Sequence, residues 1–383
     1  MAKEFDVIVF GSTGYTGRLV AEHLLKNYGA GGAVKWAMAG RSKDKLAAVA
    51  KEIGAPANLP FVVADSDDMA SLEAMAARAK VIITTAGPYQ LYGSNLVAAC
   101  AKTGTDYVDL TGESHWIAQM MAAHEAAAKK SGARIVFSCG FDSIPFDLGV
   151  YFVEQAAKKK FGAYAPRVRG RVRGMEGGLS GGTLASGQAT MAAVQKDPTV
   201  MGVLGNAFAL TPGFSGPEQP DGNTPYEDKV TGSWVGPFMM AGINTKAVHR
   251  TNFLLGHPWG KVFKYDEMQM LGGPPKPGGG GGFSFDSSLK PGEGPTKEER
   301  DKGWYDIVFI AEYADGRSLR AAVKGDRDPG YGSTSKILAE SALALTFDVP
   351  RGAGGCFSSA GVMAQALLAR LPAKAGLTFE VEG

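Results

Sequence analysis

Residues 6–25 run Asp6-Val-Ile-Val-Phe10, then Gly11-Ser12-Thr13-Gly14-Tyr15-Thr16-Gly17, then Arg18-Leu-Val-Ala-Glu-His-Leu-Leu25. The first part has the pattern of a buried strand, and the last part has the spacing of a helix. The glycines between them repeat as G-x-x-G-x-x-G, so bare backbone N–H groups and a helix N-terminus face one spot. This arrangement predicts a site for a dinucleotide pyrophosphate, although an ordinary strand-to-helix turn is the plainer alternative. The expected contacts are Gly11, Ser12, Thr13, Gly14, Tyr15 and Thr16.

Short apolar runs alternate with helical patterns from residue 6 to about residue 145, as in βαβ units around a buried parallel sheet. Right-handed crossovers between them predict a doubly wound α/β sheet of the Rossmann type, with ligand at the carboxyl ends of the strands. The predicted strands are Asp6 to Phe10, Val34 to Ala39, Phe61 to Ala64, Val81 to Thr85, Tyr107 to Leu110 and Arg134 to Ser138. The predicted helices are Gly17 to Asn27, Lys43 to Ile53, Met69 to Ala79, Ser94 to Thr103 and His115 to Ser131.

The alternation stops after Pro145, where glycine and proline become frequent. A second α+β domain with an antiparallel or mixed sheet is predicted from β-like segments at 166–175, 262–271 and 307–313. Residues 272–296 are too rich in glycine and proline for regular structure, so they predict a flexible loop.

Helical spacing returns at 333–345 and 361–370, and we expect these helices to pack on the first domain. The first domain should therefore span 1–145 and be completed by 330–383. The second should span 146–329 and hold the substrate and the contact of a homodimer.

Composition excludes several classes of function. Lys and Arg number 40 against 38 Asp and Glu, a formal charge of +2, which gives no broad field for nucleic acid. The 3 cysteines cannot form a disulfide framework, and the 5 histidines show no metal-ligand spacing. No leader pattern and no run of about 18 apolar residues occurs, so we expect a cytoplasmic protein. Contact with a membrane surface or a carrier protein stays open.

The choice of dinucleotide depends on the end of the second predicted strand, where NAD enzymes place an acid for the ribose hydroxyls. This chain has no acid there, but Arg41, Ser42 and Lys43 instead, which suit a 2′-phosphate. We therefore expect NADP, clamped by Arg41, whose alternative role is that of a solvated cation. Asp65 follows the third strand and is expected either near the adenine or as a helix cap.

The nicotinamide half should lie against the turn after the fourth strand, at Ala86, Gly87 and Pro88. Glycine removes side-chain bulk there, and proline fixes the turn. Tyr89 and Tyr92 follow closely and are expected either to pack or to act on the substrate.

The chain resembles the saccharopine dehydrogenase-like oxidoreductase family. The matching stretches are Gly11 to Gly17, Ala39 to Arg41, Ala86 to Tyr89, Gly104 to Glu113, Cys139 to Pro145 and Gly330 to Lys336. Within the family it is most similar to the branch of the trans-acting enoyl reductases and the lipid-droplet saccharopine dehydrogenase-like oxidoreductase. The resemblance implies NADP binding, a Rossmann domain and reduction of a substrate that can be lipid-linked. It supplies no catalytic residue.

Catalytic residues must therefore be argued from position. Reduction of an enoyl or imine group by hydride requires a proton on the neighbouring atom. Asp142, after the sixth strand, is the leading candidate, and its alternative role is to fix the loop by accepting backbone N–H bonds. Tyr89 and His115 are further candidates, although His115 also suits a helix start. The same rim of the sheet carries Asp109, Glu113 and Cys139.

Arginine occupies every second position in Arg167-Val-Arg169-Gly-Arg171-Val-Arg173, so a strand would carry four guanidinium groups on one face. We expect either a solvated sheet face or a dock for an anionic carrier or headgroup. Further along, Gly177 to Gly187 should form a tight loop that enters a helix, with hydroxyls either for an anion or the substrate, or only for capping the helix. An apolar cluster between 236 and 271 should be mostly core, with a minority lining a groove for an acyl chain.

Three functions remain open. The first is a reductase of an enoyl or carbonyl group on a hydrophobic, lipid-linked or carrier-linked substrate. The second is a saccharopine-type amino-acid dehydrogenase, which would need arginines around a small zwitterion. The third is a non-catalytic NADP-binding protein associated with lipid. A short-chain dehydrogenase is disfavoured because no tyrosine has lysine four positions later.

Overall fold

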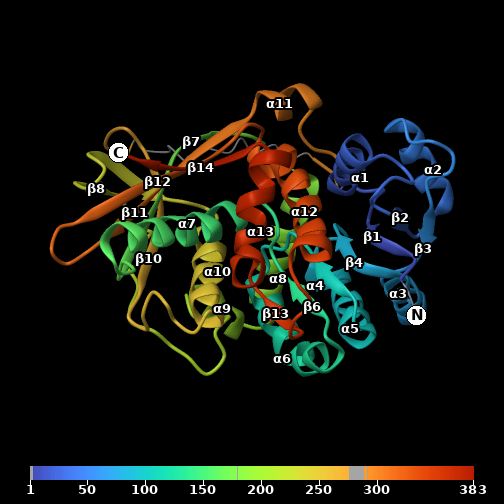
Figure 1. The fold of residues 1–383 in the computed structure, drawn as a ribbon, viewed down its shortest axis with the longest axis horizontal. Helices are drawn as coiled ribbons and strands as arrows, with labels where there is room; N and C mark the ends of the chain where they lie inside the picture. Colours follow the sequence, from blue (N-terminus) through green and yellow to red (C-terminus); the bar gives the residue numbers. More distant parts are fainter. Residues whose placement is uncertain (1–2, 179, 276–288, 291) are drawn as a thin grey trace.

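A computed structural model describes residues 3–178, 180–275, 289–290 and 292–383. The chain forms two seven-stranded sheets with helices packed on both (Figure 1). No helix among these residues is both long and apolar enough to cross a membrane. Within the predicted loop 272–296, residues 276–288 and 291 lie outside the described part of the chain.

The first sheet is parallel and has the order β13-β6-β5-β4-β1-β2-β3. All six predicted strands are present, which confirms the doubly wound α/β fold, and a short seventh strand joins them from the C-terminal region. The strands are β1 Phe5–Phe10, β2 Trp36–Gly40, β3 Phe61–Val63, β4 Ala79–Thr84, β5 Asp106–Val108, β6 Arg134–Val136 and β13 Gly355–Phe357.

Helices cover both faces of this sheet, so its strands are apolar on both sides. In β1, Val7 and Val9 point into one apolar cluster, while Ile8 and Phe10 point into the other. The helices are α1 Tyr15–Tyr28, α2 Lys43–Glu52, α3 Met69–Arg78, α4 Tyr89–Tyr92, α5 Ser94–Thr103, α6 Ser114–Ser131 and α12 Thr334–Leu343.

The second sheet is mixed and has the order β14-β12-β11-β7-β10-β9-β8, as expected for the second domain. Its strands are β7 Arg167–Glu176, β8 Tyr226–Asp228, β9 Ser233–Pro237, β10 Lys264–Met270, β11 Trp304–Glu312, β12 Ser318–Gly325 and β14 Leu377–Glu382. β7 runs parallel to β10 and antiparallel to β11. Three helices pack against the sheet, α7 Ile144–Phe161, α10 Ala241–Leu254 and α13 Ser359–Lys374.

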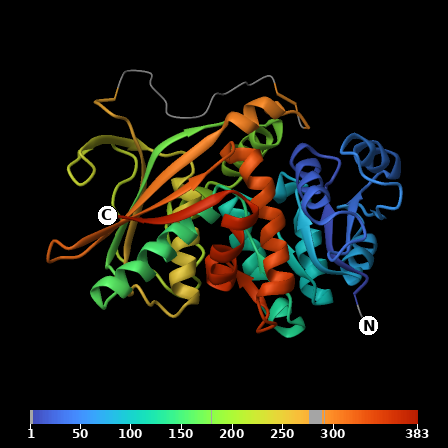
Figure 2. The ribbon, with the colours of Figure 1, turned by 45° about the horizontal axis from the view of Figure 1, so that its top comes forward.

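The C-terminal region serves both sheets. α12 packs on α1 and β4, and β13 pairs with β6, whereas β14 pairs with β12 in the second sheet. α12 and α13 therefore lie between the two sheets in the ribbon (Figure 2). The proposed limits 1–145, 146–329 and 330–383 stay a prediction, with 377–382 contributing to the second sheet.

The alternating sequence pattern ends at Pro145, but the structure has an 18-residue helix there, α7. Pro145 occupies its first turn, where the missing N–H costs no hydrogen bond. The remaining elements are α8 Gly181–Lys196, α9 Thr199–Gly205, α11 Lys297–Lys302 and the π-helical turns η1 Pro329–Ser333 and η2 Ala344–Asp348.

Candidate functional site

The turn between β1 and α1 is packed so closely that two of its glycines have no room for a side chain. Gly11 has φ of 87°, and a Cβ there would lie 2.8 Å from Thr85 Oγ1. A Cβ on Gly17 would lie 2.2 Å from the Gly11 carbonyl oxygen. No side chain caps the first turn of α1 at Gly14. The helix N-terminus therefore presents its N–H groups to an anion, as a pyrophosphate site requires.

The hydroxyls of this turn differ in use. Ser12 is buried and donates to the Val9 carbonyl at 2.5 Å, so its hydroxyl holds the turn on the strand instead of facing outward. Thr13 is exposed and Thr16 is half-buried. The Tyr15 side chain points away from the glycine loop. Its ring packs edge-on against Tyr331 with centroids 5.1 Å apart, and its hydroxyl donates to the Pro295 carbonyl.

The end of β2 carries an exposed cation. Across the described ranges no acceptor contacts the Arg41 guanidinium, which follows the last residue of β2. Ser42 is the N-cap of α2 and accepts the Lys45 N–H at 3.3 Å. Asp65 Oδ1 accepts the Asp67 N–H at 3.1 Å, while Asp68 caps α3. A guanidinium with no protein partner at this strand end suits a ribose 2′-phosphate.

A cavity of about 310 Å³ opens at the carboxyl ends of β4, β5 and β6. Its lining comes from the loops after these strands, from α8, from the start of α10 and from η1. Thr85 and Gly87 line it, and Ala86 and Pro88 complete that turn. The cavity therefore lies where the reactive end of a dinucleotide would meet a substrate.

Asp142 faces this cavity from the loop after β6. It is half-buried, and no hydrogen bond to its carboxyl is found among the described residues. Burial raises the pKa of Asp142 to about 7. A carboxyl with such a pKa is populated in both protonation states near neutral pH and can give or take a proton.

The other two catalytic candidates are engaged elsewhere. The Tyr89 ring lines the cavity, but its hydroxyl donates to the Thr84 carbonyl at 3.1 Å and receives the Leu110 N–H at 3.4 Å. His115 is not among the lining residues, and its Nε2 lies 3.2 Å from Gln90 Oε1. Burial lowers the pKa of His115. These contacts favour positioning roles for both residues.

Two buried acids in the loop after β5, Asp109 and Glu113, connect the walls of the cavity. Glu113 accepts the N–H groups of Tyr89 and Gln90 at 3.0 and 2.7 Å, and the Ser186 hydroxyl of α8. Asp109 accepts the N–H groups of Thr111 and Ser138 and lies behind the lining. Cys139 is also buried behind the lining.

α8 forms one wall of the cavity. Ser180 caps the helix and accepts the Thr183 N–H, as expected for the glycine-rich segment 177–187, of which residue 179 lies outside the described part. Thr183, Ser186, Gly187 and Thr190 face the cavity. Sequence reasoning missed the residue that contacts the start of this helix, Tyr331, although it lies in a stretch that carried the family resemblance. Only the packing of η1 against α8 brings it to the cavity.

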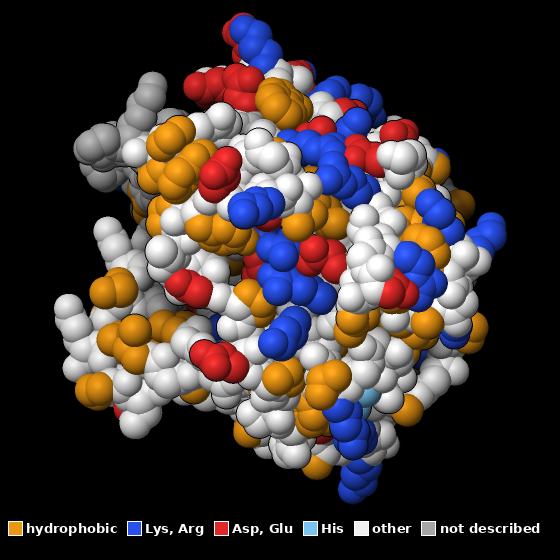
Figure 3. All heavy atoms as spheres, turned by 90° about the vertical axis from the view of Figure 1, so that its left-hand side faces the viewer, with side chains coloured by type: hydrophobic (Ala, Val, Ile, Leu, Met, Phe, Trp, Pro, Cys, Tyr) orange, Lys and Arg blue, Asp and Glu red, His pale blue; other side chains and the backbone are white. Residues whose placement is uncertain are grey.

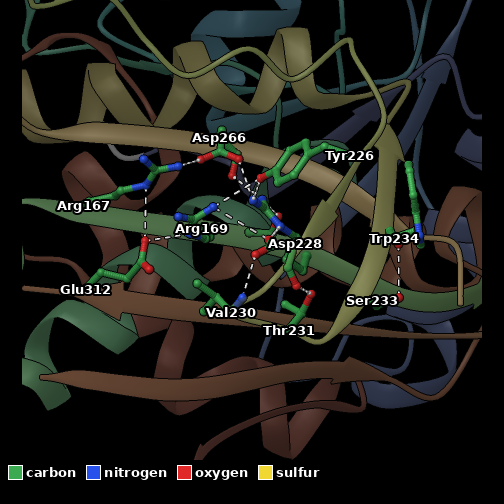
Figure 4. Close-up of polar contacts among 12 residues, drawn as sticks. Arg167, Arg169, Tyr226, Asp228, Val230, Thr231, Ser233, Trp234, Asp266 and Glu312 are labelled. Atoms are coloured by element: carbon green, nitrogen blue, oxygen red, sulfur yellow. Dashed lines mark hydrogen bonds and ion pairs between the residues drawn. The ribbon is translucent and has the colours of Figure 1, made fainter. Parts of the chain in front are cut away.

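The arginines of β7 are not an open dock. Arg171 is fully buried and pairs with Asp228 at 2.9 Å and with Asp266 at 2.8 Å. Arg169 pairs with Asp228 and Glu312, and Arg167 with Asp266 and Glu312 (Figure 4). Both expectations for this strand are therefore wrong for Arg171, which is neither solvated nor free to bind an anion.

The last arginine of the strand, Arg173, pairs with Glu382 and Asp306. On the face of the molecule in Figure 3, Lys and Arg side chains are likewise interspersed with Asp and Glu side chains. The expected apolar cluster is only partly core: Phe238, Met240, Trp259 and Phe263 are buried, whereas Met239 and Leu255 are exposed. Of its members, Met240 lines the cavity.

Comparison with known proteins agrees with this geometry. Residues 7–136 match the model of the saccharopine dehydrogenase NADP binding domain. The chain is 37% identical to a putative trans-acting enoyl reductase of Mycobacterium tuberculosis, over 99% of this chain and 97% of that protein. It is 36% identical to a trans-acting enoyl reductase of Mycobacterium ulcerans, over 97% and 96%. Apo saccharopine dehydrogenase (L-Glu forming) from Saccharomyces cerevisiae shares the fold, with a TM-score of 0.56 at 16% identity over 99% of this chain and 100% of that one.

Proposed function

Because the chain belongs to the saccharopine dehydrogenase-like oxidoreductases, in the branch of the trans-acting enoyl reductases, and is an NADP-dependent oxidoreductase, we propose that it reduces an enoyl or carbonyl group of a hydrophobic substrate. The relatives are named for action in trans on an enoyl group. The corresponding substrate here is an acyl group delivered on a carrier protein or lipid, as a thioester or ester.

The composition of the cavity wall carries this proposal. No Lys, Arg or His occurs among the described residues that line it, whereas Glu113 and Asp142 do. A free amino or keto acid has a carboxylate, and burying that anion without a cation beside two acids is unfavourable. An enoyl thioester is neutral at its reactive end, and Leu110, Met240 and Ile243 supply apolar contacts for it. The wall therefore favours an acyl substrate over a saccharopine-type amino acid.

The residues around the β1 turn fit an NADP molecule. The backbone N–H groups of Thr13, Tyr15 and Thr16, which no backbone carbonyl accepts among the described residues, would hold the pyrophosphate at the start of α1. Those of Gly11, Ser12 and Gly14 donate to backbone carbonyls and shape the turn. Arg41 would hold the 2′-phosphate, and Asp65 would lie on the adenine side. Ala86, Gly87 and Pro88 would carry the nicotinamide, which supplies a hydride when bound in its reduced form.

The chain itself must then supply a proton, and Asp142 is in position to do so. Its carboxyl faces the cavity with no protein partner among the described residues, and its proton would pass to the carbon next to the reduced one. Tyr89 and His115 support the loop that holds the substrate, through the contacts with Thr84 and Gln90.

The test is NADPH oxidation with enoyl thioesters of graded acyl length, beside a panel of amino and keto acids. Affinity should rise with chain length, by up to about 0.8 kcal/mol for each methylene that becomes buried. Turnover confined to the amino and keto acids would contradict the proposal. If no compound of either panel is turned over although NADPH still binds, a non-catalytic NADP-binding protein is favoured.

A further inference from the structure

Tyr331 brings a second protic group to the cavity. It lies in η1, is 3% exposed, and reaches the cavity beside Asp142, close enough for the two groups to interact electrostatically. The edge-on contact with Tyr15 fixes the ring from behind. The phenol is therefore held in one place at the wall of the site.

The phenol oxygen is anchored to the start of α8. It accepts the Ser180 N–H at 2.5 Å and lies 2.7 Å from Thr183 Oγ1. A phenol oxygen can accept two hydrogen bonds and still donate its own proton. When the Thr183 hydroxyl also donates to it, the Tyr331 proton is available to a group in the cavity.

Several other hydroxyls of the lining give their proton to a backbone carbonyl or a carboxylate. Tyr89 donates to the Thr84 carbonyl, Thr334 to the Pro329 carbonyl, and Ser186 to the Glu113 carboxylate. Tyr331 thus differs from these lining residues in having a proton that no backbone carbonyl or carboxylate takes among the described residues.

The two protic groups have different strengths. Burial raises the pKa of Tyr331 to about 12, although the hydrogen bonds from Ser180 and Thr183 oppose the shift. At neutral pH the phenol keeps its proton and can only share it, whereas Asp142, with a pKa of about 7, can transfer one. One group therefore suits the stabilisation of charge, and the other suits proton transfer.

We propose that the Tyr331 hydroxyl donates a hydrogen bond to the carbonyl oxygen of the enoyl substrate and stabilises the negative charge that develops there during reduction. This role rests on the proposed function. Hydride from NADPH forms the new C–H bond at the β-carbon, and NADPH becomes NADP⁺, while the electrons of the C=C bond move towards the carbonyl oxygen. The charge returns to the α-carbon as that carbon takes the Asp142 proton, and no bond to Tyr331 breaks.

The direct test observes the substrate carbonyl in protein without cofactor. Crotonyl-pantetheine with ¹³C at the thioester carbonyl is bound to wild-type protein, to Tyr331→Phe and to Tyr305→Phe, and difference infrared spectra are recorded. Tyr305 is a matched control, because its buried phenol bonds Ser333 at 2.9 Å and is absent from the lining. The carbonyl band should move to lower wavenumber in wild type and Tyr305→Phe, and should lose this shift in Tyr331→Phe.

Turnover gives the second readout. Loss of one oxyanion donor should lower kcat about 100-fold in Tyr331→Phe, with NADPH affinity unchanged. A purely structural role through α8 would alter how much thioester binds, but not the band of the bound fraction. A shift that persists in Tyr331→Phe, or an unshifted band in wild type, overturns the proposal. If the variant does not fold, the presence or absence of the shift in the wild-type spectrum decides the proposal.

The outcomes separate this inference from the proposed function. If wild type reduces enoyl thioesters and Tyr331→Phe does so equally fast, the role of Tyr331 falls alone. If the shift depends on Tyr331 but wild type reduces no enoyl thioester, the carbonyl contact stands and the proposed function falls. Failure of wild type to bind the thioester overturns both.

Discussion

Arg171 and Asp228 form an ion pair 2.9 Å long in which neither side chain reaches solvent. Asp266 completes the site from β10 at 2.8 Å. The charges come from β7, β8 and β10, so the pair joins three strands of the second sheet. Because removal of one partner leaves the other buried charges less well compensated, this network constrains the sheet more than its surface pairs do.

We therefore expect Arg171→Met to lower the free energy of unfolding by up to about 3 to 5 kcal/mol, because it removes the buried cation from two buried carboxylates and leaves them only the partly exposed Arg169 and Arg167. Urea denaturation followed by circular dichroism measures the effect. Arg173→Met is the control on the same strand, since Arg173 is partly exposed and its pairs should contribute about 1 kcal/mol or less. Equal losses in both variants would contradict this view of the strand.

The arginine strand also shows what local sequence does and does not predict. Alternation correctly put four guanidinium groups on one face of β7, because side chains alternate along a strand. Their partners were not predictable, since Glu382 is 209 residues away from Arg173 and the register of β14 is set by packing. A periodic run of charge therefore predicts a face but not its partners.

The first sheet was predictable because each βα unit is local: an apolar run, a turn and a helical period follow one another. β13 escaped prediction because Gly355–Phe357 lies in a glycine-rich stretch, outside the alternation of apolar runs and helical patterns that marked the other short strands. α7 escaped prediction because a proline such as Pro145 is common both in the first turn of a helix and just after the end of one. In the site, Asp142 follows a predicted strand, whereas Tyr331 reaches Ser180 across 151 residues.

The second prediction concerns the glycine turn. Gly17→Ala should abolish NADPH binding or folding, because its Cβ would lie 2.2 Å from the Gly11 carbonyl oxygen. Gly14→Ala should be tolerated far better, since the same oxygen would be 3.3 Å away and the residue is not in the left-handed region. NADPH titration by fluorescence and thermal melts compare the two. Similar behaviour of both variants would show that close packing at Gly17 is unimportant.

The third prediction tests the cation at the end of β2. Arg41→Ala should weaken NADPH binding by about 1.5 to 3 kcal/mol and leave NADH binding nearly unchanged. The guanidinium would contact only the 2′-phosphate, which NADH does not have. Lys45→Ala, which removes an exposed charge further along α2, is the matched control. Equal weakening of both cofactors in Arg41→Ala would remove this residue from cofactor selection.

The fourth prediction concerns pH and stability. Glu154 in α7 is buried, with one oxygen accepting the Ala165 N–H at 2.8 Å and the other without a partner among the described residues. Burial raises the pKa of Glu154 to about 8, above its value in the unfolded chain. Between these two pKa values the unfolded chain has released the Glu154 proton while the folded protein still holds it. The free energy of unfolding should therefore fall as pH rises from about 4.5 to 8.

Glu154→Gln keeps the acceptor for Ala165 and removes the titration. It should raise the free energy of unfolding at pH 8 by about 1 to 3 kcal/mol and leave it little changed near pH 4. Denaturant melts of both proteins across this range measure the difference. A gain that is the same at both ends of the range would point to packing instead of ionisation.

The last prediction tests Asp142 as the proton donor. Asp142→Asn keeps the shape of the side chain but removes the transferable proton, so turnover of an enoyl thioester should fall about 100-fold or more, with NADPH affinity retained. The pH profile gives a sharper test. Since the pKa of Asp142 is raised to about 7 and its protonated form is required, wild-type kcat should decline as pH rises through 7.

That decline should be absent from the residual activity of Asp142→Asn, because the group that titrates is gone. Asp67→Asn is the matched control: it removes an exposed carboxylate after β3 that lies outside the cavity lining, so the decline should remain. A profile that keeps its decline in Asp142→Asn would assign the proton to another group. Unaltered turnover at saturating substrate would make Asp142 a structural residue of the loop after β6.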